Sequence, residues 1–235
     1  MRAIMCAASE VNSPVIVQAS AMAREYVGPR FLKYLIMAAV EEFSEIPVCM
    51  HQDEASSLGV CEQSIQLGFS SVMIDGSLKE DMSTPSDYEY NRLLTKQVVD
   101  VAHACGVSVE GELSCLGSLE THTASKADGS GAVGHLTDTS LLTDPNQAAQ
   151  FVKETGVDAL AITIGTSHGP FKFSKPPTEK TFAVDRVREI HACLPNTHLV
   201  LPGASSVPQD WLDVINEYGG DIGETYGVPI DLLQK

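Results

Sequence analysis

Short apolar segments alternate with longer amphipathic segments along the chain, and this alternation constrains the fold more than any other feature. The apolar segments are 14–19, 46–51, 71–75, 107–112, 158–165 and 197–201. Helical patterns occupy 29–43, 57–67, 87–104, 145–155, 184–192 and 209–218. Apolar strands separated by helices are typical of a parallel sheet that is covered by helices. The sequence therefore predicts one α/β domain with six visible strands.

Two architectures fit this alternation. One is a doubly wound open sheet, and the other is an eight-stranded (β/α)8 barrel of which six strands are visible. No G-x-G-x-x-G motif follows a strand, so the usual dinucleotide-binding fingerprint of the open sheet is absent. The barrel is therefore the favoured prediction.

The composition excludes several classes of partner. A net charge of −16 argues against a nucleic-acid surface, which needs clustered Lys and Arg. No stretch of about 18 apolar residues is present, so we expect neither a transmembrane helix nor another membrane association. The N-terminus does not resemble a signal peptide, and the six cysteines are scattered without a C-x-x-C pair. These features predict reduced thiols and a cytoplasmic location.

Residues 121–139 depart from the strand–helix pattern because they are rich in Gly, Ser, Ala and Thr. A loop of this length in a compact domain is either functional or disordered. Two interpretations stay open here, a mobile lid over a site and simple disorder.

Polar residues gather where the predicted strands end. In parallel α/β folds the active site lies at the carboxyl ends of the strands, so these residues are expected to meet at one rim. They are Gln18, Ser20, His51, Asp53, Glu54, Asp75, Ser77, Glu110, Glu112, Thr166, Ser167, His168, Gly203, Ser205 and Ser206. Their coincidence on six strands predicts a catalytic or binding site.

The amino-acid sequence at these strand ends resembles that of the class II, metal-dependent fructose-bisphosphate aldolases and their tagatose-bisphosphate relatives. Matching stretches include SPVIVQAS (13–20), IPVCMHQD (46–53), SVMIDGS (71–77), VEGEL (109–113), GTSHG (165–169) and ETYGVP (224–229). The resemblance covers practically the whole chain and implies a (β/α)8 barrel. It further implies that residues 1–235 form a single domain of an incomplete barrel, without the family's first and last strands.

The resemblance also implies a reaction. The family reversibly cleaves fructose 1,6-bisphosphate to dihydroxyacetone phosphate and glyceraldehyde 3-phosphate, in glycolysis, gluconeogenesis or the Calvin cycle. A Zn²⁺ ion polarises the ketone, an aspartate moves the hydroxyl proton and a loop glutamate exchanges the proton at the enediolate carbon. The family's substrates are sugar bisphosphates and triose phosphates, and its members are usually homo-oligomers.

Family roles transfer to this chain by position. Asp53 matches the catalytic aspartate and Glu120 the loop glutamate. His168 matches a zinc ligand, and Glu112 and Asp75 match secondary carboxylates near the metal. Ser20, Gly169, Gly203 and Ser205 fall in or beside segments that bind the substrate phosphates.

Two of the family's three zinc histidines are replaced. Glu54 follows the catalytic aspartate where the family has histidine, and Pro202 directly follows the 197–201 segment where the family has another histidine. Glu54 offers an oxygen as a weak replacement, whereas proline offers no ligand. We therefore expect zinc affinity far below that of a three-histidine site. Three interpretations follow: an aldolase with a remodelled metal site, a catalytically silent remnant or interaction protein, and a phosphate-binding barrel with altered chemistry.

Overall fold

A parallel sheet forms the centre of the molecule. The computed structural model describes residues 1–81, 83–118, 123–125, 131–135, 141–169, 173–178 and 183–234. In this part of the chain, six parallel strands form a half-barrel in the order β1 (Val15–Ser20), β2 (Val48–Ala55), β3 (Ser71–Ile74), β4 (Ser108–Glu112), β8 (Ala159–Ala161) and β9 (His198–Val200). The strand order follows the chain without reversal, which confirms the predicted barrel-type order and excludes the doubly wound alternative.

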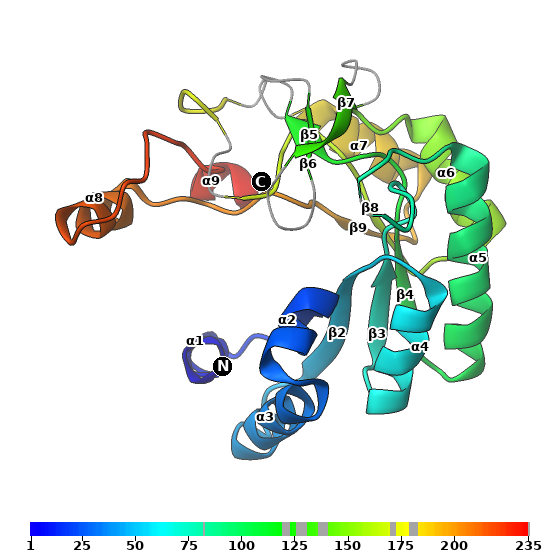
Figure 1. The fold of residues 1–235 in the computed structure, drawn as a ribbon, viewed down its shortest axis with the longest axis horizontal. Coiled ribbons are helices and arrows are strands. Elements are labelled where there is room, and N and C mark those ends of the chain that lie inside the picture. Colours follow the sequence, from blue (N-terminus) through cyan, green and yellow to red (C-terminus); the bar gives the residue numbers. More distant parts are fainter. Residues whose placement is uncertain are drawn as a thin grey trace.

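Helices connect the strands. They are α1 (Arg2–Val11), α2 (Ala21–Val27), α3 (Pro29–Glu42), α4 (Leu58–Leu67), α5 (Tyr88–Ala104), α6 (Pro145–Thr155), α7 (Val184–Cys193), α8 (Gln209–Glu217) and α9 (Ile230–Leu233). Figure 1 shows α4 to α7 following one another around the outer side of the sheet. The six predicted helices correspond to α3 to α8, and α1, α2 and α9 are additional to these six patterns. No helix in the described ranges combines the length and apolar character needed to cross a bilayer.

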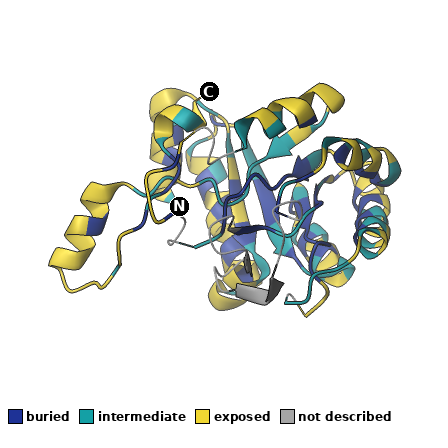
Figure 2. Ribbon diagram, turned by 90° about the horizontal axis from the view of Figure 1, so that it is seen from above, coloured by how far each residue is buried: buried dark blue, intermediate teal, exposed yellow. Residues whose placement is uncertain are grey.

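The main core lies between the sheet and the outer helices. Phe151 of α6 packs there with Leu160 and Ile162, and all three side chains are fully buried. A neighbouring cluster joins Val72 and Val109 of the sheet to α4 and α5. Figure 2 shows this burial along the strands and the helix faces that meet them. Burial of side chains of this size stabilises the fold by about 1.5–3 kcal/mol each.

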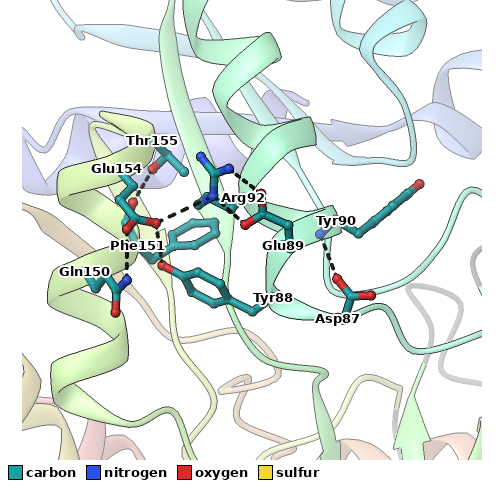
Figure 3. A network of polar contacts seen from close by, with 9 residues as sticks. All are labelled: Asp87, Tyr88, Glu89, Tyr90, Arg92, Gln150, Phe151, Glu154 and Thr155. Carbon is teal, nitrogen blue, oxygen red and sulfur yellow. Dashed lines mark hydrogen bonds and ion pairs between the residues drawn. The ribbon is translucent and has the colours of Figure 1, made fainter.

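A polar network joins α5 to α6 beside this core (Figure 3). The Tyr88 hydroxyl donates to Glu154 Oε2 at 3.0 Å, and its ring meets Phe151 edge-on with centroids 6.0 Å apart. Arg92 Nε lies 3.7 Å from the same Glu154 oxygen. The two helices that follow β3 and precede β8 are thus held side by side by packed rings as well as charged groups.

Both open ends of the half-barrel expose apolar side chains. Ile16 on β1 is 61% exposed, and Phe31 on α3 is 78% exposed. Helix α8 stands away from the sheet (Figure 1), and Leu212 is its one buried residue. Trp211 and Tyr218 of this region are 66% and 84% exposed. The molecule therefore carries large apolar surface beside its β1 edge and around α8.

The segment after β4 differs from the expectation. The composition predicts a loop over 121–139, whereas β5 (Gly117–Ser118), β6 (Thr123–Ser125) and β7 (Gly131–His135) form a three-stranded antiparallel sheet. Small and polar residues show no alternation of apolar and polar positions, so the pattern does not indicate strands. Residues 119–122, Glu120 among them, and residues 126–130 and 136–140 lie outside the described residues, and the choice between lid and disorder stays a prediction for them.

Candidate active site and metal centre

Strand β2 extends further than predicted and carries two acidic residues within it. The sequence predicts that the strand ends at residue 51, but β2 runs to Ala55, whose carbonyl accepts from Asp75 N at 3.0 Å. The register with β3 shifts between Gln52 and Ala55, and Glu54 adopts a φ of 53° there. The predicted boundary was therefore wrong, because a β-bulge lets the strand continue through its polar residues.

Asp53 faces a cavity of about 430 Å³ at the carboxyl rim of the sheet. The cavity is lined by Gln18, Asp53, Glu54, Met73, Glu110, Ala161, His168, Val200, Leu201, Pro202, Gly203, Ala204 and Ser205. Burial, and then the charge of Glu54, raise the pKa of Asp53, while a hydrogen bond from Gln18 opposes the rise. A carboxyl group with a raised pKa in a cavity is suited to exchanging protons with a bound molecule.

Three carboxyl groups converge beside Asp53. One oxygen from each of Glu54, Asp75 and Glu112 lies within 4.8 Å of the others. Asp75 Oδ1 accepts from the backbone N–H of Ser77 at 2.9 Å and from its hydroxyl at 2.6 Å. Burial, and then the charge of Glu54, raise the pKa of Asp75 to about 6. Burial, and then Asp75, raise the pKa of Glu112 well above its usual range.

His168 reaches the cluster through Glu54. Its Nε2 lies 3.1 Å from Glu54 Oε1, and the two side chains are 21% and 9% exposed. The loop that carries His168 is held against the end of β9, because Thr166 Oγ1 donates to the Pro202 carbonyl at 2.6 Å. The structure thus brings together four of the predicted metal-site residues, namely Glu54, Asp75, Glu112 and His168.

A second buried pair lies inside the half-barrel. His51 Nδ1 is 2.7 Å from the Ser71 hydroxyl, and its Nε2 is 3.5 Å from Glu110 Oε2. Burial lowers the pKa of His51 to about 4. Burial, and then the charge of Asp53, raise the pKa of Glu110 to about 8. Glu110 was expected at the rim but was given no role there, although the spacing of Glu110 and Glu112 places both on one face of β4.

The predicted phosphate-binding residues separate into two groups. Gly203 and Ser205 line the cavity, and Gly169 directly follows His168 with a φ of 82°. A Cβ at Gly203 would lie 2.6 Å from the Ser167 carbonyl oxygen, so glycine permits this close approach. Ser20 is not among the described lining residues, and its hydroxyl instead accepts from Ala23 N at 3.2 Å to cap α2.

These donors do not fit a zinc centre built from three imidazoles. Pro202 lines the cavity without a ligating side chain, and His168 is the imidazole that adjoins the carboxylate cluster. Catalytic zinc sites have three protein ligands that commonly include two or three nitrogens or sulfurs. One imidazole among carboxylates is a different donor set.

Comparisons with known proteins identify the relatives of this chain. Residues 1–221 match the family model described as fructose-bisphosphate aldolase class-II. A fructose-bisphosphate aldolase from Pseudomonas aeruginosa is 66% identical over 231 residues, which are 98% of this chain and 65% of that protein. One from Stutzerimonas stutzeri is 65% identical with the same coverage. The chain thus spans about two thirds of the length of these curated relatives.

Solved structures share the fold. An aldolase from Escherichia coli K12 superposes with a TM-score of 0.65 at 25% identity, over 98% of this chain and 72% of that one. A fructose-1,6-bisphosphate aldolase from Coccidioides immitis, itself described as putative, gives a TM-score of 0.66 at 24% identity, over 96% of this chain and 70% of that one. The latter likeness bears on the fold alone.

Proposed function

The chain belongs to the class II fructose-bisphosphate aldolase family, and from this premise we propose that it catalyses reversible aldol cleavage of a sugar bisphosphate. The substrate we propose is fructose 1,6-bisphosphate, which yields dihydroxyacetone phosphate and glyceraldehyde 3-phosphate. The observation that carries the proposal is Asp53 in a cavity that Gln18, Gly203 and Ser205 also line, with a hydrogen bond from Gln18 to Asp53. Tagatose 1,6-bisphosphate is the natural competing substrate to test.

Asp53 is proposed as the proton-transfer group. As the carbon–carbon bond breaks, the hydroxyl proton on the aldehyde-forming carbon passes to the Asp53 carboxylate. The bonding electron pair stays with the ketone fragment, which becomes an enediolate and is then protonated at carbon. Glu120 is proposed for that second proton transfer, and it lies outside the described residues.

Gly203 and Ser205 are proposed to hold a substrate phosphate. Ser205 contributes a hydroxyl at the rim, and the segment around Gly203 is brought against the His168 loop. Holding the phosphate fixes the ketone relative to Asp53, and such positioning contributes strongly to rate because a misplacement of about 1 Å can cost about 100-fold.

Release of triose phosphate from fructose 1,6-bisphosphate tests the proposal. The unaltered chain should turn over the substrate in the presence of a divalent cation, and Asp53→Asn should lower kcat by about 10²–10⁴-fold through loss of the proton acceptor. Asp100→Asn, on the exposed face of α5, is the control and should leave kcat unchanged. Equal rates for Asp53→Asn and the unaltered chain would refute the role of Asp53.

We further propose that residues 1–235 act as one domain that assembles with copies of itself in the cytoplasm. Exposed Phe31 and Tyr34 on α3 and exposed Trp211 on α8 support self-association. The six unpaired cysteines support a reducing compartment. Sedimentation equilibrium tests the assembly, and a monomer at all accessible concentrations would contradict it.

A further inference from the structure

Three adjacent strands each place one carboxyl group in the same small region at the carboxyl rim of the sheet. Glu54 comes from the bulge in β2, Asp75 directly follows β3, and Glu112 ends β4. One oxygen of each lies within 4.8 Å of the other two. Three like charges at such distances repel one another strongly in a buried site, so their convergence is costly unless positive charge or protons compensate it.

Glu112 supplies an independent sign of a missing ligand. Its side chain is fully enclosed, with the residue 2% exposed, and its Oε2 has no hydrogen-bond partner among the described residues. Leaving a buried oxygen without a partner costs about 1–3 kcal/mol, and more when the group is charged. A cation at the cluster would satisfy this oxygen. Asp75 meanwhile is oriented by two hydrogen bonds from Ser77, so its carboxyl group does not turn away freely.

The donor chemistry points to a particular class of ion. Carboxylate oxygens suit Mg²⁺, Ca²⁺ and Mn²⁺, whereas zinc sites favour nitrogen and sulfur. Oxygens that share one ion are at most about 4.2 Å apart on Mg²⁺ and about 5 Å apart on Ca²⁺, so three oxygens within 4.8 Å of one another need only small side-chain shifts to share an ion. His168, 3.1 Å from Glu54, adjoins the cluster and adds one nitrogen, which Mn²⁺ also accepts.

We propose that Glu54, Asp75 and Glu112 bind a hard divalent cation, of which Mn²⁺ is the best probe, in place of the imidazole-bound zinc of the family. Glu54 is the residue that changes the preference, because it puts an oxygen where a nitrogen would favour zinc. This inference stands on the carboxylate cluster and does not depend on cleavage of any sugar bisphosphate.

Titration of the chelator-treated chain with Mn²⁺ alone tests the site, with the electron paramagnetic resonance signal of free Mn²⁺ as readout. One equivalent should bind. Glu54→Gln and Asp75→Asn should each weaken binding by about tenfold or more, since each removes a charged ligand. Glu110→Gln is the matched control, because Glu110 is a buried carboxyl of the same strand as Glu112 but lies outside the cluster. It should bind Mn²⁺ as the unaltered chain does.

A second titration addresses the preference. Calorimetry with Zn²⁺ alone and Mn²⁺ alone should show that Glu54→His shifts the ratio of the two Kd values by about tenfold or more toward Zn²⁺. Absence of saturable Mn²⁺ binding up to millimolar concentration would overturn the site. Equal weakening by Glu110→Gln would also overturn it, and an unchanged ratio in Glu54→His would overturn the assigned preference. Where one of the two ligand variants fails to fold by circular dichroism, the other decides the result.

Discussion

His51 is a buried base whose pKa of about 4 keeps it neutral in the folded chain at mildly acidic pH. Burial lowers its pKa from 6.5 to about 4, so between these values the unfolded chain binds a proton that the folded chain does not. Stability is therefore highest above pH 6.5 and decreases as the pH falls, by up to about 3 kcal/mol from this residue. Urea unfolding at pH 7.5 and pH 5 should show this loss, and His51→Asn should reduce it.

His191→Asn is the control for that measurement, because His191 is exposed at the end of α7. It should leave the pH dependence of stability unchanged. A loss of equal size in His51→Asn and the unaltered chain would show that the dependence comes from other groups.

Gly203 offers a test of the contact between the rim segments. Both Gly203 and Gly106 have a φ near +70°, but a Cβ at Gly106 meets nothing within 4 Å, whereas one at Gly203 would lie 2.6 Å from Ser167 O. Gly106→Ala should cost about 1–2 kcal/mol for the left-handed backbone alone. Gly203→Ala should cost more and displace the His168 loop. Equal costs by urea unfolding would contradict a close contact at Gly203.

For single residues, the sequence predicted best the position of ionisable side chains that follow an apolar strand. Asp53, Asp75 and His168 could be placed at the rim because they follow apolar runs. The side-chain direction of Glu54 could not, because it depends on a bulge and a φ of 53° that no local pattern signals. Gln18 was noticed as polar but not assigned, since its hydrogen bond to Asp53 joins two strands.

Helix α6 shows how a single cap residue fixes an element. Asp144 accepts from Gln147 N at 2.9 Å, and Pro145 begins the helix. Asp144→Ala should lower the free energy of unfolding by about 1 kcal/mol, because an N–H of the first turn loses its acceptor. Asp144→Asn keeps an acceptor and should stay within a few tenths of a kcal/mol. Thermal unfolding checks both, and equal losses would show that the cap bond contributes little.

Most elements with apolar periodicity were predictable, whereas the strands built from small residues were not. The range of α6 was predicted without error because Asp144 and Pro145 mark its start and Gly156 its end. Strands β6 and β7 were not predicted, because a strand of small residues shows no alternation of apolar and polar positions. The short α2 was not among the predicted helices, because its N-cap residue Ser20 was interpreted as a phosphate-binding residue.

The whole molecule carries a net charge of −16 on 235 residues. Repulsion among exposed carboxylates destabilises a compact state, and salt screens it beyond about 10 Å at 0.1 M. Raising NaCl from about 10 to about 150 mM should therefore raise the Tm, with about 2–4 °C for each kcal/mol gained. KCl should act alike, because screening does not depend on the identity of the monovalent cation. A Tm that falls or stays constant would show that repulsion is not significant.

The bulge in β2 affects which substitutions this site tolerates. Gln52 turns outward, where its Oε1 accepts from Ser64 on α4, and Ala55 is buried on that same outer side, yet Asp53 and Glu54 between them both line the cavity. Glu54 therefore occupies a place that a regular strand would not have. Because pairing with β3 resumes at Ala55, a new side chain at position 54 that accepts a φ of 53° alters the chemistry of the rim without changing the register of the sheet.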